Sequence, residues 1–312
     1  MRSTTMLSGV VGWTFIAIWG ADAADLAVYQ KAPVAYPVFA PAVDAVNEKV
    51  DFFGGSVGGK SVYGANGSIT APLGGQFGAQ VDGSVGSMDQ DTFAAVAGHL
   101  FWRDPSRALL GVYASETYWD RYGGISVGHV GGEGELYWGR VTLQGVAGVE
   151  FGNSASTTNT SIATGPVLTT TSTFLDAYDI KTRFFDEINL KYYFADDISG
   201  YVGHRYLGGL NALALGAEFA RPLGRGILAS AFVEGRVGEN DARGIWGGLK
   251  VYFGPSDMPL IARNRNEDPN NWNVDNLFGI LGNHTSSTSS TTTSNCKTEP
   301  LFKHKGSCES TD

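Results

Sequence analysis

Apolar and polar residues alternate along most of the chain, through residues 50–254. Ile188 and Leu190, for example, alternate with Asn189 and Lys191. A period of two predicts β-strands, because successive side chains of a strand point to opposite faces. Each run lasts about ten residues, which suits a tilted strand that crosses a membrane, whereas strands of soluble proteins mostly have about 5–6 residues. The pattern therefore predicts membrane-spanning strands.

The polar face carries full charges in run after run, among them Asp82, Glu150 and Lys191. The dry core of a soluble β-sandwich would not accept unpaired charges on its inner face. The interior of a membrane barrel is polar and does accept them. The alternative is a soluble protein in which these charges face water and the apolar faces close one common core.

Two sets of connectors alternate between the runs, and they differ in length. One set is short and rich in turn residues, whereas the other includes the long, Ser/Thr-rich stretch 153–183. Outer-membrane barrels have short periplasmic turns and longer outer loops, so the short set is assigned to the periplasm. The prediction is an all-β fold, an antiparallel up-and-down transmembrane β-barrel of about 12 strands, with ten or eight as alternatives. The short turns fall at 72–75, 104–107, 138–139, 195–198 and 222–224, and the outer connectors near 58–61, 86–91, 120–124, 153–183, 208–210 and 238–242.

Aromatic residues mark the ends of the predicted strands. Aromatic girdles are expected at both membrane interfaces of a barrel, and chance placement is the alternative. The predicted girdle consists of Trp102, Trp138, Phe194 and Phe253 at the periplasmic ends and Tyr118, Trp119 and Phe151 at the outer ends.

The composition agrees with a sheet in apolar surroundings. The chain has 43 glycines among 312 residues and 17% charged residues, whereas soluble domains average about 7% glycine and about 25% charged residues. The net charge of −9 argues against a nucleic-acid partner, because phosphate binding needs a basic surface. We expect no cofactor.

The N-terminus is typical of a secretory signal peptide. Arg2 precedes a mostly apolar stretch, residues 6–19, and Ala21-Asp22-Ala23 forms a small-x-small cleavage site. Cleavage would remove residues 1–23; an uncleaved anchor is the alternative, but the apolar stretch is short for a membrane span. Residues 24–49, which contain prolines, are predicted to be an extended periplasmic leader.

Residues 255–312 differ in character from the rest and form a partly disordered C-terminal extension in this prediction. Short helices are expected within 259–266 and 272–281, followed by a Ser/Thr tract, 284–295, that is typical of a linker or of disorder. Cys296 and Cys308 are expected to pair in an oxidising compartment and to form a small periplasmic knot or tether. A metal site is disfavoured, because two thiols and one nearby histidine leave no obvious fourth ligand.

No catalytic residue is assigned from the sequence. Barrel hydrolases place histidine and serine at close spacing on a strand, but no serine lies two residues after His99, His129 or His204. Each of these histidines is interpreted as a hydrogen-bonded lumen or girdle residue. The protein is therefore not expected to be an enzyme.

The inward polar residues are better explained by electrostatics. Tight hairpins near 224 and 240 would bring Glu218 and Lys250 together across the small Ser230, and Glu135 would lie near Arg140 at a turn. Such pairs either line an aqueous path or fill the lumen. The predicted lumen-lining residues are Gln80, Asp82, Glu135, Arg140, Gln144, Glu150, Lys191, Glu218, Ser230, Glu234, Arg236 and Lys250.

Several segments resemble one family. Residues 248–253, Gly-Leu-Lys-Val-Tyr-Phe, resemble the last-strand signal of outer-membrane barrels, and Ala24-Asp25-Leu26 with Lys31-Ala32-Pro33 resembles the mature start of small porin-like barrels of alphaproteobacteria. Residues 98–105 and 202–206 are similar to stretches in an uncharacterised branch of that group.

The resemblance covers roughly residues 18–254 and implies a barrel in the cell outer membrane, in contact with lipids and with the barrel assembly machinery. One departure stands out: in many barrels the final phenylalanine ends the chain, whereas here residues 254–312 follow it.

Two functions remain open on these grounds. The first is a passive pore for ions or small hydrophilic solutes, favoured by the small residues on the inward faces. The alternative is a structural or surface-exposed envelope protein with a filled, non-conducting barrel. A substitution such as Lys250→Glu should change the ion selectivity of a pore.

Overall fold

The computed structural model describes residues 40–165 and 168–294. The predicted signal peptide, most of the predicted leader, and Cys296 and Cys308 with their expected disulfide lie outside the described residues. Residues 40–46 precede the first strand, where the backbone N–H of Ala42 donates to the Gly75 carbonyl at 3.1 Å.

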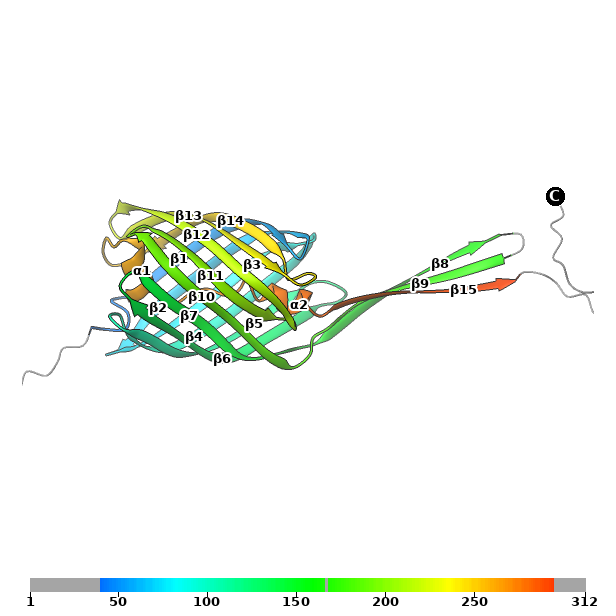
Figure 1. The fold of residues 1–312 in the computed structure, drawn as a ribbon, viewed down its shortest axis with the longest axis horizontal. Coiled ribbons are helices and arrows are strands. Elements are labelled where there is room, and N and C mark those ends of the chain that lie inside the picture. Colours follow the sequence, from blue (N-terminus) through cyan, green and yellow to red (C-terminus); the bar gives the residue numbers. More distant parts are fainter. Residues whose placement is uncertain (1–39, 166–167, 295–312) are drawn as a thin grey trace, which may run out of the picture. The chain divides into compact units, whose positions relative to one another are not determined.

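Twelve strands form a closed antiparallel barrel (Figure 1). Each strand pairs with its sequence neighbour, except that β7 pairs with β10, and pairing of β1 with β14 closes the ring. The 12-stranded barrel is thus confirmed over its alternatives. The strands are β1 (Asn47–Val57), β2 (Lys60–Gly74), β3 (Phe77–Met88), β4 (Asp91–Asp104), β5 (Ala108–Trp119), β6 (Ile125–Trp138), β7 (Val141–Gly152), β10 (Arg183–Ala195), β11 (Ile198–Leu207), β12 (Leu210–Gly224), β13 (Ile227–Gly238) and β14 (Gly244–Phe253).

The barrel is apolar on the outside and largely polar on the inside. Along β12, Leu213 and Leu215 are exposed on the outer face, whereas Ala212 and Ala214 are buried inside. A soluble sandwich would bury the apolar face, so the exposed apolar belt excludes that alternative. A belt of this kind is what a barrel presents to lipid.

The two ends of the barrel differ in their connectors. At the short-turn end, two or three residues join each hairpin, as at 75–76, 139–140 and 225–226. At the long-loop end lie the connectors 120–124 and 239–243, and the hairpin between β7 and β10. β1 begins and β14 ends at the short-turn end, as the sequence predicts.

A second sheet continues from the long-loop end. Its strands are β8 (Ser154–Thr164), β9 (Leu168–Asp179) and β15 (His284–Ser294), in the order β15-β9-β8. The prediction that residues 284–295 form a linker or are disordered is therefore wrong for β15. Its Ser/Thr sequence has no core of its own, but β9 supplies a ladder of backbone hydrogen bonds, and threonine fits a strand well.

Between β14 and β15 the chain forms two short helices, α1 (Leu260–Asn266) and α2 (Leu277–Leu281). The first helix agrees with the prediction, and the second occupies the last half of the range expected to be helical. No helix in the described part of the chain is long and apolar enough to cross a membrane.

The outer belt gives a test of what surrounds it. Leu215→Arg places a charge near the middle of the belt and should lower the free energy of unfolding in lipid vesicles by about 2–4 kcal/mol. Ile162→Arg is the matched control, because Ile162 is also an exposed apolar residue but lies on β8, beyond the barrel; its effect should stay within about 0.5 kcal/mol. Equal effects of the two substitutions in a denaturant titration would contradict the assignment of the belt.

Candidate functional site: the filled lumen

Residues 254–283, called the plug, run through the barrel from one end to the other. The plug begins at the short-turn end, where the N–H of Gly254 donates to the Gly226 carbonyl at 3.0 Å. Helix α1 is fastened there as well: the N–H of Leu260 donates to Asp197 Oδ1 at 2.9 Å, and Arg265 donates to the Gly139 carbonyl at 2.9 Å. Buried Arg263 forms an ion pair with Glu267. Figure 1 shows α1 and α2 at opposite ends of the barrel.

Past α1 the plug is extended and polar, and it bonds to the inner wall. Lys49 on β1 forms a buried ion pair with Asp268, with Nζ and Oδ2 2.5 Å apart. Gln80 on β3 donates to the carbonyl of Pro269 at 3.3 Å. Asn273 donates to Ser84 Oγ at 2.9 Å. These three wall residues, which alternation directs inward, thus have partners on the plug.

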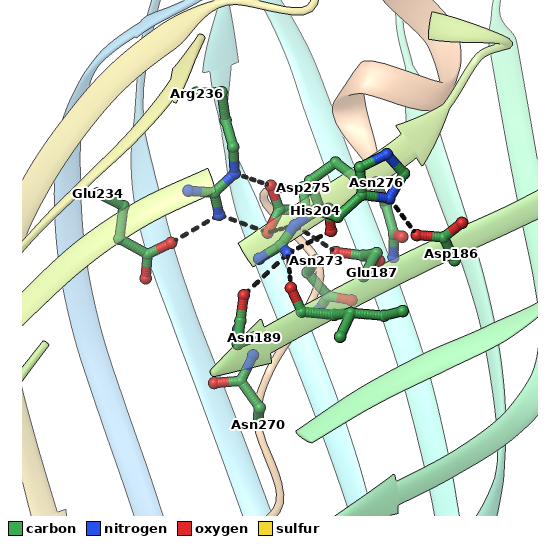
Figure 2. A network of polar contacts seen from close by, with 12 residues as sticks. Asp186, Glu187, Asn189, His204, Glu234, Arg236, Asn270, Asn273, Asp275 and Asn276 are labelled. Atoms are coloured by element: carbon green, nitrogen blue, oxygen red, sulfur yellow. Dashed lines mark hydrogen bonds and ion pairs between the residues drawn. The ribbon is translucent and has the colours of Figure 1, made fainter. Parts of the chain in front are cut away.

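Asp275 of the plug is held by buried ion pairs with the wall (Figure 2). Arg236 on β13 forms a two-point contact with it, with Nε–Oδ1 and Nη2–Oδ2 distances of 2.6 Å each. Arg205 on β11 adds a third contact from Nε to Oδ2 at 3.1 Å and also faces Glu187 at 3.3 Å. All four side chains are buried. A forked guanidinium contact of this type is strong and geometrically selective.

Helix α2 forms an apolar layer near the long-loop end. Leu277, Phe278, Ile280 and Leu281 are each at most 4% exposed. They belong to one buried cluster with inward side chains of the wall, and this layer is called the seal. The wall members of the cluster include Phe53, Phe93, Trp119, Val127, Phe185, Leu207 and Trp246.

Where the plug leaves the lumen, its backbone passes close to the backbone of the β11–β12 turn. A Cβ added to Gly282 would lie 2.7 Å from the Cα of Gly208, and one added to Gly208, whose φ is +61°, would lie 2.6 Å from the Cα of Gly282. Glycine at both positions therefore allows the exit to pass the β11–β12 turn. The next residue, Asn283, accepts a hydrogen bond from Arg183 at 2.5 Å and leads directly into β15.

His284 holds the start of β15 at this exit. Its Nε2 lies 2.5 Å from Asp176 Oδ1, and its Nδ1 lies 3.7 Å from Asp241 Oδ2. Tyr122 also donates to Asp176. Burial raises the pKa of the Asp176 carboxyl, but the hydrogen bonds from Tyr122 and His284 outweigh it, so the pKa lies below its ordinary value. These side chains form the exit clamp.

The clamp predicts a pH-dependent anchor for β15. Because the folded pKa of Asp176 is depressed, its contribution is present above the unfolded pKa of about 3.9 and is lost as pH falls through the folded value. Asp176→Asn should weaken the anchor by about 1–3 kcal/mol at pH 7 and speed amide hydrogen exchange in residues 284–294 accordingly. The difference from wild type should shrink as the pH falls below the unfolded pKa of about 3.9.

Asp179→Asn is the control, since Asp179 lies on the same strand but its carboxylate accepts from Ser154. If both variants exchange at the wild-type rate, the clamp does not anchor β15.

Some space remains beside the plug. A polar cavity of about 60 Å³ is lined by Asp51, Lys191, Glu218, Glu234 and Lys250, among others. That volume holds a few water molecules. Predicted partners Glu218 and Lys250 meet here at 3.9 Å, and Ser230 donates to Glu218 at 2.7 Å.

The structure brings the predicted lumen residues together, with one exception. Arg140 lies exposed in the β6–β7 turn, and its expected pairing with Glu135 is wrong: it forms an ion pair with Asp196 at 2.6 Å, while Glu135 accepts from Tyr137.

The register of β12 with β13 differs by two residues from the expected one, because Glu218 lies opposite Phe232 and not opposite Ser230. The turn at 225–226 lies past the assumed hairpin centre, which accounts for the shift. The others face inward: Gln80, Asp82, Glu135, Gln144, Glu150, Lys191, Glu218, Ser230, Glu234, Arg236 and Lys250.

Most of the predicted girdle lies on the outer face, but Trp119 does not. It is fully buried in the seal, and its indole N–H donates to the Met88 carbonyl at 3.0 Å. Neighbours on a strand face opposite ways, so Tyr118 and Trp119 cannot both point outward. Exposed are Trp138, Phe194, Phe253, Tyr118 and Phe151, and Trp102 is half-buried.

The histidines behave as the sequence suggests. His99 lies between Asp82 at 3.0 Å and Glu133 at 2.7 Å, and His129 faces Glu150 at 3.3 Å. His204 is exposed and bonds Asp186 at 2.7 Å (Figure 2). No group of three or more acidic, histidine or cysteine side chains in the described residues is arranged to hold a metal.

Sequence reasoning missed the residues of the plug itself. Asp275, Asn273 and Asn276 lie in the stretch 267–276, which is dense in Asn and Asp. Amide-rich stretches without hydrophobic periodicity usually indicate a loop, yet here Asn273 and Asn276 both have partners on the wall. The useful signal was the excess of inward charges, which need partners if the lumen is filled.

The fold and the lumen together define a class: a closed 12-stranded barrel with an apolar exterior and a lumen filled by its own C-terminal segment. No protein-family model and no curated protein matches the chain.

Three solved structures are similar to it in part. The siderophore receptor PirA from Pseudomonas aeruginosa has 13% identity and a TM-score of 0.27 over 62% of this chain, and the match spans 43% of the receptor, less than half its length. The Ralstonia pickettii toluene transporter TbuX has 6% identity and a TM-score of 0.31, over 69% of this chain and 90% of the transporter. A Pseudomonas aeruginosa FadL homologue has 8% identity and a TM-score of 0.26, over 66% and 86%. At these values the similarities do not define a function for this chain.

Proposed function

We propose that the protein is an outer-membrane barrel closed by its own plug, which acts as a structural envelope protein and presents the β8-β9-β15 sheet at the cell surface. The observation that carries this proposal is the seal, where α2 packs against inward side chains across the lumen. Ions would have to cross a dry apolar layer, and hydrophobic constrictions of this kind block conduction.

The outer belt and the connectors support the location. Apolar side chains face outward along the strands, and aromatic residues such as Trp138 and Phe194 are exposed beside the short turns. Barrels of this class turn their short connectors to the periplasm and their longer loops outward. Lipids and the barrel assembly machinery are the partners that this location implies.

The lumen charges support closure rather than flow. Lys49, Arg205 and Arg236 are satisfied by carboxylates of the plug and of the wall. The four apolar side chains of α2 contribute about 1.5–3 kcal/mol each on burial, as an upper estimate. Removing the plug would therefore forfeit several kcal/mol of apolar burial and leave buried charges without partners.

The test is single-channel recording of the full chain, without its predicted signal peptide, refolded into a planar bilayer. The expected result is an inserted barrel that gives no unitary current steps. Insertion is checked by protection of the barrel from protease. Stable steps from every inserted wild-type molecule would overturn the proposal.

A passive pore is the second candidate, favoured by the polar cavity beside the plug. If that cavity extends into a path when the plug shifts, Lys250 and Glu218 would line it. Lys250→Glu should then move the reversal potential of any open state toward cation preference, because the cavity loses a positive charge and gains a negative one. The control is Lys60→Glu, which alters the turn-proximal Lys60–Asp89 pair at the long-loop end. Open states with wild-type selectivity in Lys250→Glu would remove the cavity from the path.

A further inference from the structure

The two ends of the plug are bound to opposite ends of the barrel. Gly254 and α1 bond to turns of the short-turn end, at Gly226, Asp197 and Gly139. Gly282 passes the β11–β12 turn at the long-loop end, and His284 then starts a strand that pairs with β9. The chain therefore enters the lumen at one face of the barrel and leaves at the other.

We propose that the barrel carries its own C-terminal segment across the membrane, and that residues 284–294 are delivered to the cell surface through the lumen. The transported substrate is a polypeptide, extended in passage and covalently continuous with β14. This inference rests on the proposed function, because it needs the barrel to span the outer membrane with its short turns inside.

The closed wall makes the lumen the route. β1 and β14 pair without a break from Glu48↔Phe253 to Val57↔Gly244. A finished barrel has no lateral opening, so the plug either lies inside while β1 and β14 close or threads through afterwards. In both cases residues 284–294 cross the plane of the barrel through its interior.

The plug also has the form that passage requires. Its middle stretch, 267–276, has no regular helix and presents polar side chains to a polar wall. Its helices are short, with seven and five residues. A Cβ added to Gly279 would lie 2.8 Å from Glu150 Oε2, so glycine is needed for the close fit there. The backbone of Gly282 passes directly against the backbone of Gly208. The segment that passes, β15, consists of serine and threonine after His284, and small polar side chains slide through such a lumen more easily than bulky apolar ones.

Different contacts hold the part of the segment inside the lumen and the part outside it. The Asp275 contacts and the seal hold the plug in the lumen, and the exit clamp with the β15–β9 ladder holds the emerged strand. Pairing outside with β9 stabilises the emerged strand, because the full ladder from His284↔Tyr178 to Ser294↔Leu168 forms only once the strand is outside. This pairing keeps the chain from slipping back.

The experiment is labelling of single cysteines on intact cells by a membrane-impermeant maleimide. In the full chain with Cys296→Ser and Cys308→Ser, Ser287→Cys and Ser289→Cys place thiols on exposed positions of β15. Both should label on intact cells to the same extent as after permeabilisation of the outer membrane. Two sites are used so that one poorly tolerated substitution does not decide the result.

Two control positions establish which end of the barrel lies on which side of the membrane. Thr160→Cys lies on exposed β8 and reaches the surface without crossing the lumen, whereas Ser106→Cys lies in a turn of the short-turn end. Thr160→Cys should label on intact cells and Ser106→Cys only after permeabilisation. If Thr160→Cys labels but both β15 sites need permeabilisation, β15 stays inside, and the inference fails together with the surface display of β15, while a silent barrel in the bilayer would still support closure. If Ser106→Cys labels on intact cells and Thr160→Cys does not, the barrel is inverted and the inference fails with its orientation.

Discussion

Replacement of Asp275 by asparagine should release the plug from the barrel wall. The substitution keeps the shape of the side chain but leaves Arg205 and Arg236 buried without their shared carboxylate. Removing one partner of a buried ion pair costs about 3–5 kcal/mol. Amide hydrogen exchange of residues 260–281 should therefore accelerate by roughly two to three orders of magnitude, with the exchange of the barrel strands much less changed.

A charge-balanced variant distinguishes the loss of the ion pairs from a general destabilisation of the fold. Asp275→Asn combined with Arg236→Gln removes both members of the closest pair and leaves Arg205 facing Glu187. This double variant should exchange more slowly than Asp275→Asn alone, because fewer buried charges lack partners. Slow, wild-type exchange in Asp275→Asn would show that the ion pairs do not hold the plug.

Leu277→Asp should open the seal. Leu277 is fully buried in the apolar layer, and burying a carboxyl group among apolar side chains is costly. The expected cost is several kcal/mol in the docking of α2, with entry of water into the layer. In a planar bilayer this variant should give unitary current steps where wild type gives none.

Leu277→Met is the matched control, since it keeps an apolar side chain of similar volume and should cost less than about 1.5 kcal/mol. It should stay silent in the bilayer. A Leu277→Asp barrel that inserts and stays silent would show that closure does not depend on α2.

The barrel could be predicted from the sequence because its information is local. A strand has a period of two, so each run such as Ile188–Phe194 assigns its own faces, and short turns such as 138–139 separate the runs. An even number of runs lets the first and last strands pair antiparallel and so permits closure. The Trp119 error shows the limit, because a girdle position was inferred from its place along the strand although the alternation with Tyr118 already directed it inward.

The lumen could be predicted in part only. The sequence indicates which wall side chains point inward, but not what meets them, because the contacts between Arg236 and Asp275 or Lys49 and Asp268 join residues far apart in the chain. The sequence indicates the two short helices of the plug, but the plug has no strong periodicity that would show which of its residues meet the wall. The Ser/Thr tract of β15 becomes a strand through its partner β9, which no local pattern specifies.

The most direct measurement of the central claim is a cross-link between the plug and the inner wall. In the chain with Cys296→Ser and Cys308→Ser, Ser84→Cys on β3 and Asn273→Cys in the plug replace two side chains that are 2.9 Å apart. A short bifunctional thiol reagent should join them in the folded, membrane-inserted protein, whereas Ser84→Cys with Ser287→Cys on β15 should stay unlinked. Efficient linkage of 84 to 273 is the result that we predict. Absence of that link, with both thiols reactive after unfolding, would contradict a lumen filled by the chain's own C-terminal segment.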